Sequence, residues 1–251
     1  MNRINVIITH RDDKHDLEKC LKSVKETGDE FFLIDSVDSQ KARGICHMHK
    51  IKYLKNEPSV IATILDEKNM NGSNEYVLIT GSNEFLSGGL KNNMALLRST
   101  LNYDAYRFVI LKNYYGRWMK HSGLYPNQEI RLYRKNLVTW AGNTIILNPE
   151  AEKKATIGTF SGEIYCMVYS SISDYINQIN RATEAEAEMQ FNSGTKSNVL
   201  KIMFRPWVHF IHLFFIKLGF LDGYYGLVNA VISGYGEFLI QVKLRFFRKM
   251  D

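Results

Sequence analysis

The sequence YVLITGSNEFLS, residues Tyr76–Ser87, joins an apolar run directly to a polar turn. The run Val77–Thr80 consists of large apolar and β-branched residues, which is typical of a buried β-strand. It leads into the turn Gly81-Ser82-Asn83-Glu84, and in an open α/β sheet ligands bind at the carboxyl ends of the strands. The turn is therefore a candidate binding site, and Glu84 is its single carboxylate.

Strand-like and helix-like segments alternate along the first half of the chain. Apolar runs predict strands, and apolar residues at helical spacing predict helices. This alternation predicts a doubly wound α/β sheet. The predicted strands are Ile4–Thr9, Glu30–Ile34, Ile51–Leu54, Tyr76–Thr80, Tyr106–Lys112 and Glu129–Tyr133, and the predicted helices are Asp16–Val24, Val60–Leu65, Leu90–Leu101 and Ile172–Met189. The fold class that we expect is α/β with a mixed sheet and a C-terminal helical extension.

The break Asn192-Ser193-Gly194-Thr195 is the best candidate for a domain boundary. We expect one domain over residues 1–192 and a basic, aromatic, helical extension over residues 193–251. Within the extension, Pro206–Ile216 contains no Lys, Arg, Asp or Glu. These eleven residues are fewer than the roughly 20 needed to cross a bilayer, so we expect an amphipathic element that lies in the membrane plane.

Composition and charge indicate the cellular compartment of the protein and the kind of partner that it binds. The chain has 251 residues and three widely spaced cysteines, which do not form a disulfide framework and favour a reducing compartment. The apolar run Val6-Ile7-Ile8 near the start is too short for a signal-peptide core, so we expect a cytoplasmic protein. Residues 201–251 hold seven Lys and Arg against three Asp and Glu. This excess predicts an anionic partner, and a membrane surface is favoured over nucleic acid because no nucleic-acid-binding motif accompanies the charge.

Three segments resemble one known family. They are INVIITHRDDKHDLEKCLKSV (4–24), which is followed by Asp29-Glu30 and LIDS (33–36), then GLYPNQEIRLYRK (123–135), and finally RPWVHFIHLFFIKLGFLDGYYGLVNAVISGYGEFL (205–239). Together they resemble bacterial family 2 glycosyltransferases of the GT-A fold, in the branch that builds the lipopolysaccharide inner core. The part GFLDGYYGL is the most specific.

The resemblance implies transfer of a hexose from a nucleotide sugar, most simply a UDP-hexose, to a glycolipid acceptor at the cytoplasmic face of the inner membrane. It assigns the nucleotide to Thr9 and Asp35 at the ends of the first two strands. The alternative for Asp35 is a turn or helix-capping aspartate, which strand-to-helix junctions favour. Glu84 matches the last acidic position of the family motif and is the weak catalytic candidate. Its alternative is a solvated turn residue.

The chain departs from the family at three polar positions. Arg11-Asp12 stands where the family has Asn-Glu, Gly81–Glu84 replaces Asp-x-Asp-Glu, and residues 140–150 lack the family's His-Glu pair. We therefore expect no metal site built from side chains alone. Mg²⁺ or Mn²⁺ would bind only with a nucleotide sugar that completes its coordination.

Basic side chains offer a substitute for the metal. Gln128 and Arg131 form a Q-x-x-R pattern, and with Arg134 they are candidates to contact the diphosphate or the acceptor. The alternative is a salt-bridged edge strand. Two functions stay open on this basis: an active transferase, or an inactive pseudo-glycosyltransferase that serves as a binding or scaffolding partner of another transferase.

The extension supplies the candidate membrane contact. Aromatic and basic residues alternate there, as they do at the level of lipid headgroups. The competing interpretation is that the aromatic residues pack a homo-oligomer interface. The candidate residues are Arg205, Trp207, Phe210, Phe214 and Lys217.

Overall fold

The structure is a computed structural model, and it describes residues 2–55, 74–141, 144–147 and 155–250. The helix expected at Val60–Leu65 lies outside the described residues. The chain separates into two compact units, Met1–Ile110 with Gln128–Cys166, and Leu111–Asn127 with Met167–Asp251. The expected domain boundary after residue 192 stays a prediction.

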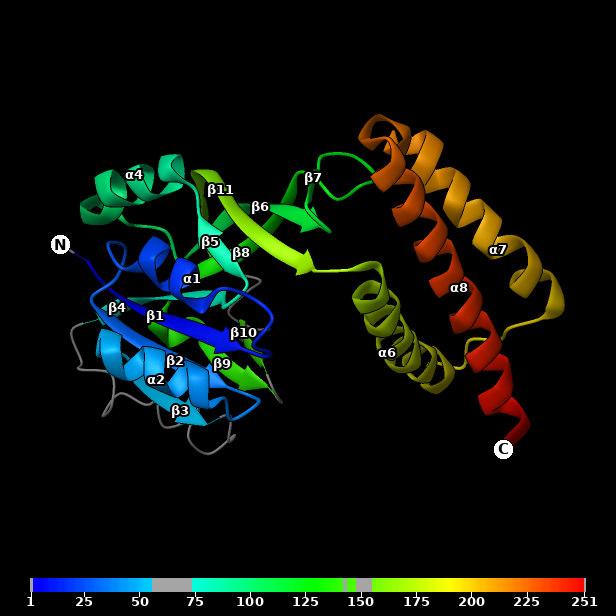
Figure 1. Cartoon of the computed structure of the whole chain (residues 1–251), viewed down its shortest axis with the longest axis horizontal. Helices are drawn as coiled ribbons and strands as arrows, with labels where there is room; N and C mark the ends of the chain where they lie inside the picture. The colour runs from blue at the N-terminus through cyan, green and yellow to red at the C-terminus, as the bar shows by residue number, and fades with distance from the viewer. Residues whose placement is uncertain (1, 56–73, 142–143, 148–154, 251) are drawn as a thin grey trace. The chain divides into compact units, whose positions relative to one another are not determined.

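Parallel strands form one side of the main sheet (Figure 1). In spatial order they are β3 (Lys52–Lys55), β2 (Glu30–Asp35), β1 (Arg3–His10) and β4 (Asn74–Gly81). Val6, Ile7 and Ile8 of β1 are all buried, although successive side chains point to opposite faces of the sheet. Burial on both faces explains why this strand is an unbroken apolar run.

Beyond β4 the strands change direction. The order continues with β8 (Asn127–Arg134), β6 (Ala105–Tyr114), β11 (Ile157–Tyr169) and β5 (Glu84–Leu86). Strand β8 is antiparallel to β4, and β5 is antiparallel to β11. Short β7 (Arg117–Met119) pairs with β6, while β9 (Val138–Ala141) and β10 (Thr144–Leu147) form a separate hairpin. The predicted α/β class with a mixed sheet is confirmed.

Strand β11 was not predicted from the sequence. Its residues, IGTFSGEIYCMVY, include two glycines, which lower strand propensity. Gly162 has a φ of +109°, and a Cβ at this position would lie 2.7 Å from the Cα of Leu90. The glycine is therefore required by the close contact between β11 and α4 (Gly88–Leu97).

Polar caps begin the first helices. Asp16 caps α1 (Leu17–Val24), and Ser39 caps α2 (Gln40–His49) by accepting a hydrogen bond from the Ala42 N–H at 3.1 Å. Residues Cys46–His49 end α2. Cys46 is buried one turn after Ala42, whereas the histidines are exposed, so the segment is amphipathic at helical spacing.

Three helices dominate the second unit. In Figure 1, α8 (Tyr224–Met250) lies between α6 (Ile172–Asn192) and α7 (Val199–Ile211), and it packs against both. After α7 the chain forms a π-helical turn, η3 (His212–Ile216), and a 3-10 turn, η4 (Gly219–Asp222). The helix predicted at Ile172–Met189 is α6, extended by three residues.

The apolar helix of this unit is longer than the run Pro206–Ile216 indicated. It begins at Val199. Asn198 is its N-cap residue, and the Asn198 side chain accepts a hydrogen bond from the Lys201 N–H at 2.8 Å. Among the described residues, Val199–Ile216 is the one segment that is helical, long and apolar enough to cross a membrane, and none of it is buried. This finding rests on length and composition alone.

The family-like sequence GFLDGYYGL covers η4 and the first turn of α8. Asp222 is buried and accepts hydrogen bonds from the backbone N–H groups of Lys120 (3.3 Å) and His121 (2.9 Å). A Cβ at Gly226 would lie only 1.8 Å from the carbonyl oxygen of Gly219. The most specific residues of this sequence therefore hold a tight helical turn against the loop that follows β7.

Candidate active site at the strand ends

Strands β1, β2 and β4 are parallel, so their carboxyl ends meet at one edge of the sheet. His10 is paired with Asp35 of β2, and Thr9 is paired with Gly81 of β4. The polar turn of Gly81–Glu84 follows β4 directly. This edge therefore brings together the three segments in which the sequence placed candidate residues.

Glu84 is buried, with 4% of its surface exposed, rather than solvated. Its Oε2 accepts hydrogen bonds from the Thr80 hydroxyl (3.0 Å) and from the Gly81 N–H (2.8 Å). Its Oε1 lies 2.7 Å from Nη2 of Arg131. Both carboxylate oxygens therefore already have donors, and the alternative of a solvated turn residue is wrong.

Arg131 lies between two carboxylates. Its Nη2 is also 2.9 Å from Oε2 of Glu129 on the same strand, and its Nε is buried without a hydrogen-bond partner among the described residues. Burial alone would lower the pKa of this guanidinium, but Glu84 and then Glu129 outweigh burial and raise the pKa. Arg131 is thus a fixed cation near the carboxyl edge of the parallel strands, and its Nε–H has no acceptor among the described residues.

These donors do not fit a divalent metal ion. The turn has a single carboxylate, and Arg131 already neutralises it. Within the part of the chain that the structure describes, no group of three or more His, Cys, Asp or Glu side chains is placed to hold a metal. At this turn the available groups are therefore a guanidinium and backbone donors.

Arg134 lies at the far end of β8, away from the strand ends, whereas Gln128 lies near the start of β8 on the side of the strand ends. Arg134 pairs with Tyr76, near the start of β4, and its Nε lies 3.3 Å from the Tyr76 hydroxyl and 3.7 Å from Asp104. Gln128 is exposed. Of the three residues suggested for the diphosphate or acceptor, Arg131 is the one that forms an ion pair with Glu84.

Asp35 lies at the end of β2 and is 2% exposed. Its Oδ2 accepts from the Ser39 N–H (2.6 Å) and the Tyr53 hydroxyl (2.7 Å), and its Oδ1 accepts from the Val37 N–H (2.9 Å). These bonds are those of a turn aspartate. Burial, and then the bond to Asp35, raise the pKa of Tyr53 to about 12. Thr9 donates more weakly to the Thr80 carbonyl, at 3.4 Å.

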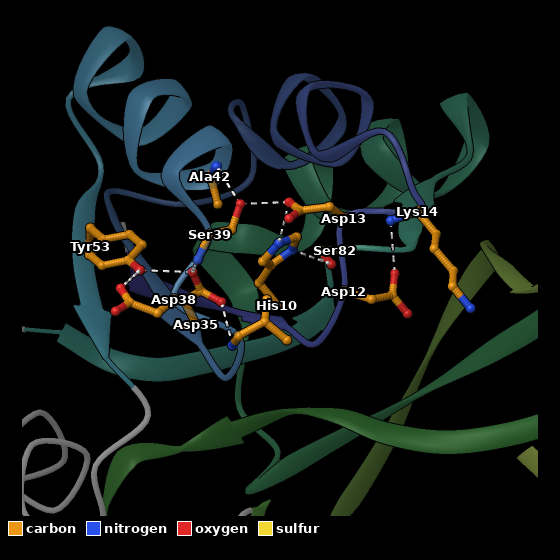
Figure 2. A network of polar contacts seen from close by, with 11 residues as sticks. His10, Asp12, Asp13, Lys14, Asp35, Asp38, Ser39, Ala42, Tyr53 and Ser82 are labelled. Atoms are coloured by element: carbon orange, nitrogen blue, oxygen red, sulfur yellow. Dashed lines mark hydrogen bonds and ion pairs between the residues drawn. The ribbon is translucent and has the colours of Figure 1, made fainter.

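A polar network that the sequence did not indicate connects these segments, as Figure 2 shows. Buried His10 contacts the Ser82 hydroxyl through Nδ1 (3.0 Å) and Asp13 through Nε2 (3.2 Å). Asp13 accepts from the Ser39 hydroxyl at 2.6 Å, and this bond is the main reason that the pKa of Asp13 is lowered. The network ties β1, the turn after β4 and the start of α2 together. Its members lie up to 72 residues apart, so no local pattern could reveal it.

The candidate membrane residues take two different positions. Trp207 is 66% exposed, whereas Phe210 and Phe214 are half-buried and stack on each other at 5.5 Å. Arg205 forms an ion pair with Glu237 of α8 at 3.0 Å, and Lys217 is exposed. The outward apolar face of α7 and η3 is therefore not the one that the sequence suggested. It consists of Leu200, Phe204, Trp207, Ile211 and Phe215.

No family model matches the chain. Two relatives resemble it over 98% of its length and 87% of their own: an uncharacterized glycosyltransferase of Rickettsia typhi, 24% identical, and one of Rickettsia prowazekii, 23% identical. Among solved structures, S. aureus TarS 1-349 in complex with UDP-GlcNAc has a TM-score of 0.48 and 13% identity, and the match covers 99% of this chain and 92% of that chain. The relatives found by sequence span nearly the whole chain, and they support a glycosyltransferase family for this protein.

Proposed function

We propose that the protein is a metal-independent glycosyltransferase that transfers a hexose from a UDP-sugar to a glycolipid acceptor in the synthesis of a bacterial surface glycan such as the lipopolysaccharide core. The observation that carries the proposal is the buried pair of Arg131 and Glu84 at the carboxyl edge of the parallel strands. The glycosyltransferase names of the relatives support the reaction class.

Arg131 takes the part that a divalent cation plays in related chemistry. When the bond between the sugar and the diphosphate breaks, negative charge develops on the leaving phosphate oxygens. A guanidinium that is already fixed in place stabilises this charge without reorganisation. The Arg131 side chain is 19% exposed, so part of its guanidinium remains accessible at the strand ends.

Glu84 is a positioning residue in this proposal. Its carboxylate accepts from Thr80, Gly81 and Arg131, so it has little capacity left to take a proton from the acceptor. It holds the guanidinium at the strand ends instead. Thr9 and Asp35, at neighbouring strand ends, are the proposed nucleotide contacts.

A second function is favoured by one specific observation. The oxygens of Asp35 and Glu84 are all engaged in internal hydrogen bonds. Such a site is stable without a ligand, which suits a non-catalytic member that scaffolds a partner transferase. Fold alone does not separate the two functions.

Calorimetric titration with UDP, UDP-glucose and UDP-N-acetylglucosamine, in Mn²⁺ or in EDTA, tests the proposal. We expect a UDP-sugar to bind equally well in both buffers, with UDP release when an acceptor extract is added. Arg131→Lys keeps the positive charge but loses the planar guanidinium that donates two parallel hydrogen bonds. It should weaken binding of the UDP-sugar by about tenfold. Arg134→Lys is the matched control on the same strand and should bind like wild type.

Two results would decide against this proposal. A strict requirement for Mn²⁺ would overturn the metal-independent mechanism. A folded wild-type protein that binds none of the nucleotides would leave the scaffolding function in its place.

We propose that the protein is peripheral and lies at the cytoplasmic face of the inner membrane. The support is the exposed apolar face of α7 and η3, together with a second exposed stripe on α8. Residues of this stripe recur every three or four positions, and they are Leu227, Val231, Tyr235, Phe238, Val242 and Phe246. An apolar surface of this extent on a folded chain is typical of an interaction site. A spanning orientation of α7 is disfavoured because Lys201, Arg205 and two histidines lie within it and η3.

A further inference from the structure

The second unit carries a groove that has no role in the proposed transfer. It has a volume of about 490 Å³ and is lined by one side of α7 and η3 and by Glu237 of α8. A volume of this size is typical of small-ligand sites. Two rows of side chains form the lining: a basic row of Lys201, Arg205, His209 and His212, and an apolar row of Leu200, Phe204 and Val208.

Helical spacing explains why the two rows are separate. Members of each row follow one another at intervals of three or four residues, which places them on one stripe of a helix. The apolar row is exposed along its whole length. It is also continuous, at the same spacing, with Ile211 and Phe215 of the outward apolar face.

The basic row has more donors than its surroundings can satisfy. Arg205 pairs with Glu237, which also accepts a hydrogen bond from Gln241 at 3.3 Å. The Lys201 ammonium donates to the Lys196 carbonyl at 2.7 Å, a neutral acceptor. Neither the His209 nor the His212 imidazole has a hydrogen-bond or ion-pair partner within the part of the chain that the structure describes. The groove therefore favours an anion.

The start of α7 strengthens this preference. Asn198, the N-cap residue, lines one end of the groove. The N-terminus of a helix carries partial positive charge, and α7 is 13 residues long. The helix end and the basic row thus favour negative charge in the same place.

We propose that this groove binds the phosphate headgroup of an anionic phospholipid, with an acyl chain lying along the apolar row. The proposal rests on the peripheral membrane location given above and adds a discrete lipid site to it. A lipid is preferred to a free anion because the groove is half apolar, and an apolar row gives a free phosphate nothing to contact.

A second copy of the chain fits this surface less well. A symmetric interface would bring the basic row of one copy against the same surface of the other, and like charges repel. Across residues 199–250 the sequence holds only two carboxylates, Asp222 and Glu237, and both already have partners. The partner copy would therefore supply no free carboxylate from these helices.

Vesicle flotation of the full chain tests the site. We expect binding to phosphatidylcholine vesicles that contain phosphatidic acid and much weaker binding to phosphatidylcholine alone. The double variant Lys201→Gln/His212→Gln should bind the anionic vesicles at least about fivefold more weakly, the effect of losing roughly one cation near a charged surface. Arg181→Gln, an exposed cation of α6 outside the groove, is the matched control and should bind like wild type.

Two further experiments distinguish a lipid headgroup from free phosphate and from a second copy of the chain. Inorganic phosphate should displace the protein no better than chloride at equal ionic strength, and stronger displacement by phosphate would overturn the lipid assignment. Sedimentation velocity should show the same oligomeric state for wild type and the double variant. A dimer lost in that variant would assign the groove to a second copy. Circular dichroism of each variant shows that it is folded.

Failure of the site and failure of the proposed function give different results. If wild type binds anionic vesicles and the double variant binds them equally, the groove is not a lipid site, while the membrane location stands. If wild type binds neither kind of vesicle but still binds a UDP-sugar, the membrane location and the groove fall together and the transferase function stands. The variant Trp207→Ala, on the outward face, should weaken binding to both kinds of vesicle.

Discussion

The His121 imidazole lies 2.9 Å from the Asp222 carboxylate, although 101 residues separate them in the sequence. The same carboxylate accepts two backbone N–H groups of the loop after β7. One buried side chain thus fixes the loop to the turn between α7 and α8.

The first prediction concerns this contact. Asp222→Ala should lower the free energy of unfolding by about 2–4 kcal/mol, because it leaves buried donors without an acceptor. Urea denaturation followed by circular dichroism measures the loss. Glu188→Ala, an exposed carboxylate of α6, should change the free energy by less than about 0.5 kcal/mol. A similar small change for Asp222→Ala would show that the contact is dispensable.

The second prediction is that Arg131 and Glu84 depend on each other for stability. Arg131→Met leaves the buried Glu84 carboxylate unpaired, which should cost about 3 kcal/mol or more. Adding Glu84→Gln removes that charge and should restore part of the loss. A double-mutant cycle from urea melts measures the coupling, which we expect to exceed about 1 kcal/mol. Additive losses would contradict the pairing.

The third prediction concerns acid stability. The bond from Ser39 lowers the pKa of Asp13 below its ordinary value of 3.8. A carboxylate whose pKa is lower in the folded state stabilises the protein above the unfolded-state pKa, and this contribution disappears as pH falls through the folded-state pKa. Below about pH 4 the free energy of unfolding should therefore fall less steeply with decreasing pH in Ser39→Ala than in wild type.

The control for this prediction is another helix cap. Ser39→Ala also removes the cap of α2, which should cost about 1 kcal/mol at every pH. Ser87→Ala removes the cap of α4 and no hydrogen bond to a carboxylate. It should lower the free energy of unfolding at every pH and leave its dependence on pH below about pH 4 unchanged. If the free energy of unfolding depends on acidic pH in the same way in both variants, the role given to Asp13 is ruled out.

The fourth prediction is that the native protein resists thiol reagents. Cys20, Cys46 and Cys166 are all buried, and burial raises the pKa of Cys46 to about 11 and that of Cys20 further still. The thiolate is the reactive form, so labelling at pH 8 should be slow when the protein is folded and complete in urea. Rapid labelling of any one cysteine in the folded protein would show that its surroundings open.

The central parallel strands β1, β2 and β4 could be predicted because they are largely buried on both faces and contain apolar runs, such as Val77–Thr80. The later strands were harder to predict, since β11 contains two glycines, one of which, Gly162, is required by its contact with α4. Glu84 and Arg131 were both identified from the sequence, but their pairing was not. It depends on β4 and β8 being neighbours, and this is a tertiary fact. The His10 network was missed for the same reason.

The close approach of Gly226 to Gly219 has a consequence for tracing the ancestry of this chain. A side chain at Gly226 would collide with the Gly219 carbonyl, so GFLDGYYGL encodes the turn between the two helices and contains none of the residues near Glu84. A search that begins from this signature gathers proteins that share an architecture, whether or not they have kept the chemistry. Active and silent descendants of one ancestor would be retrieved together, and the residues near Glu84 would have to tell them apart.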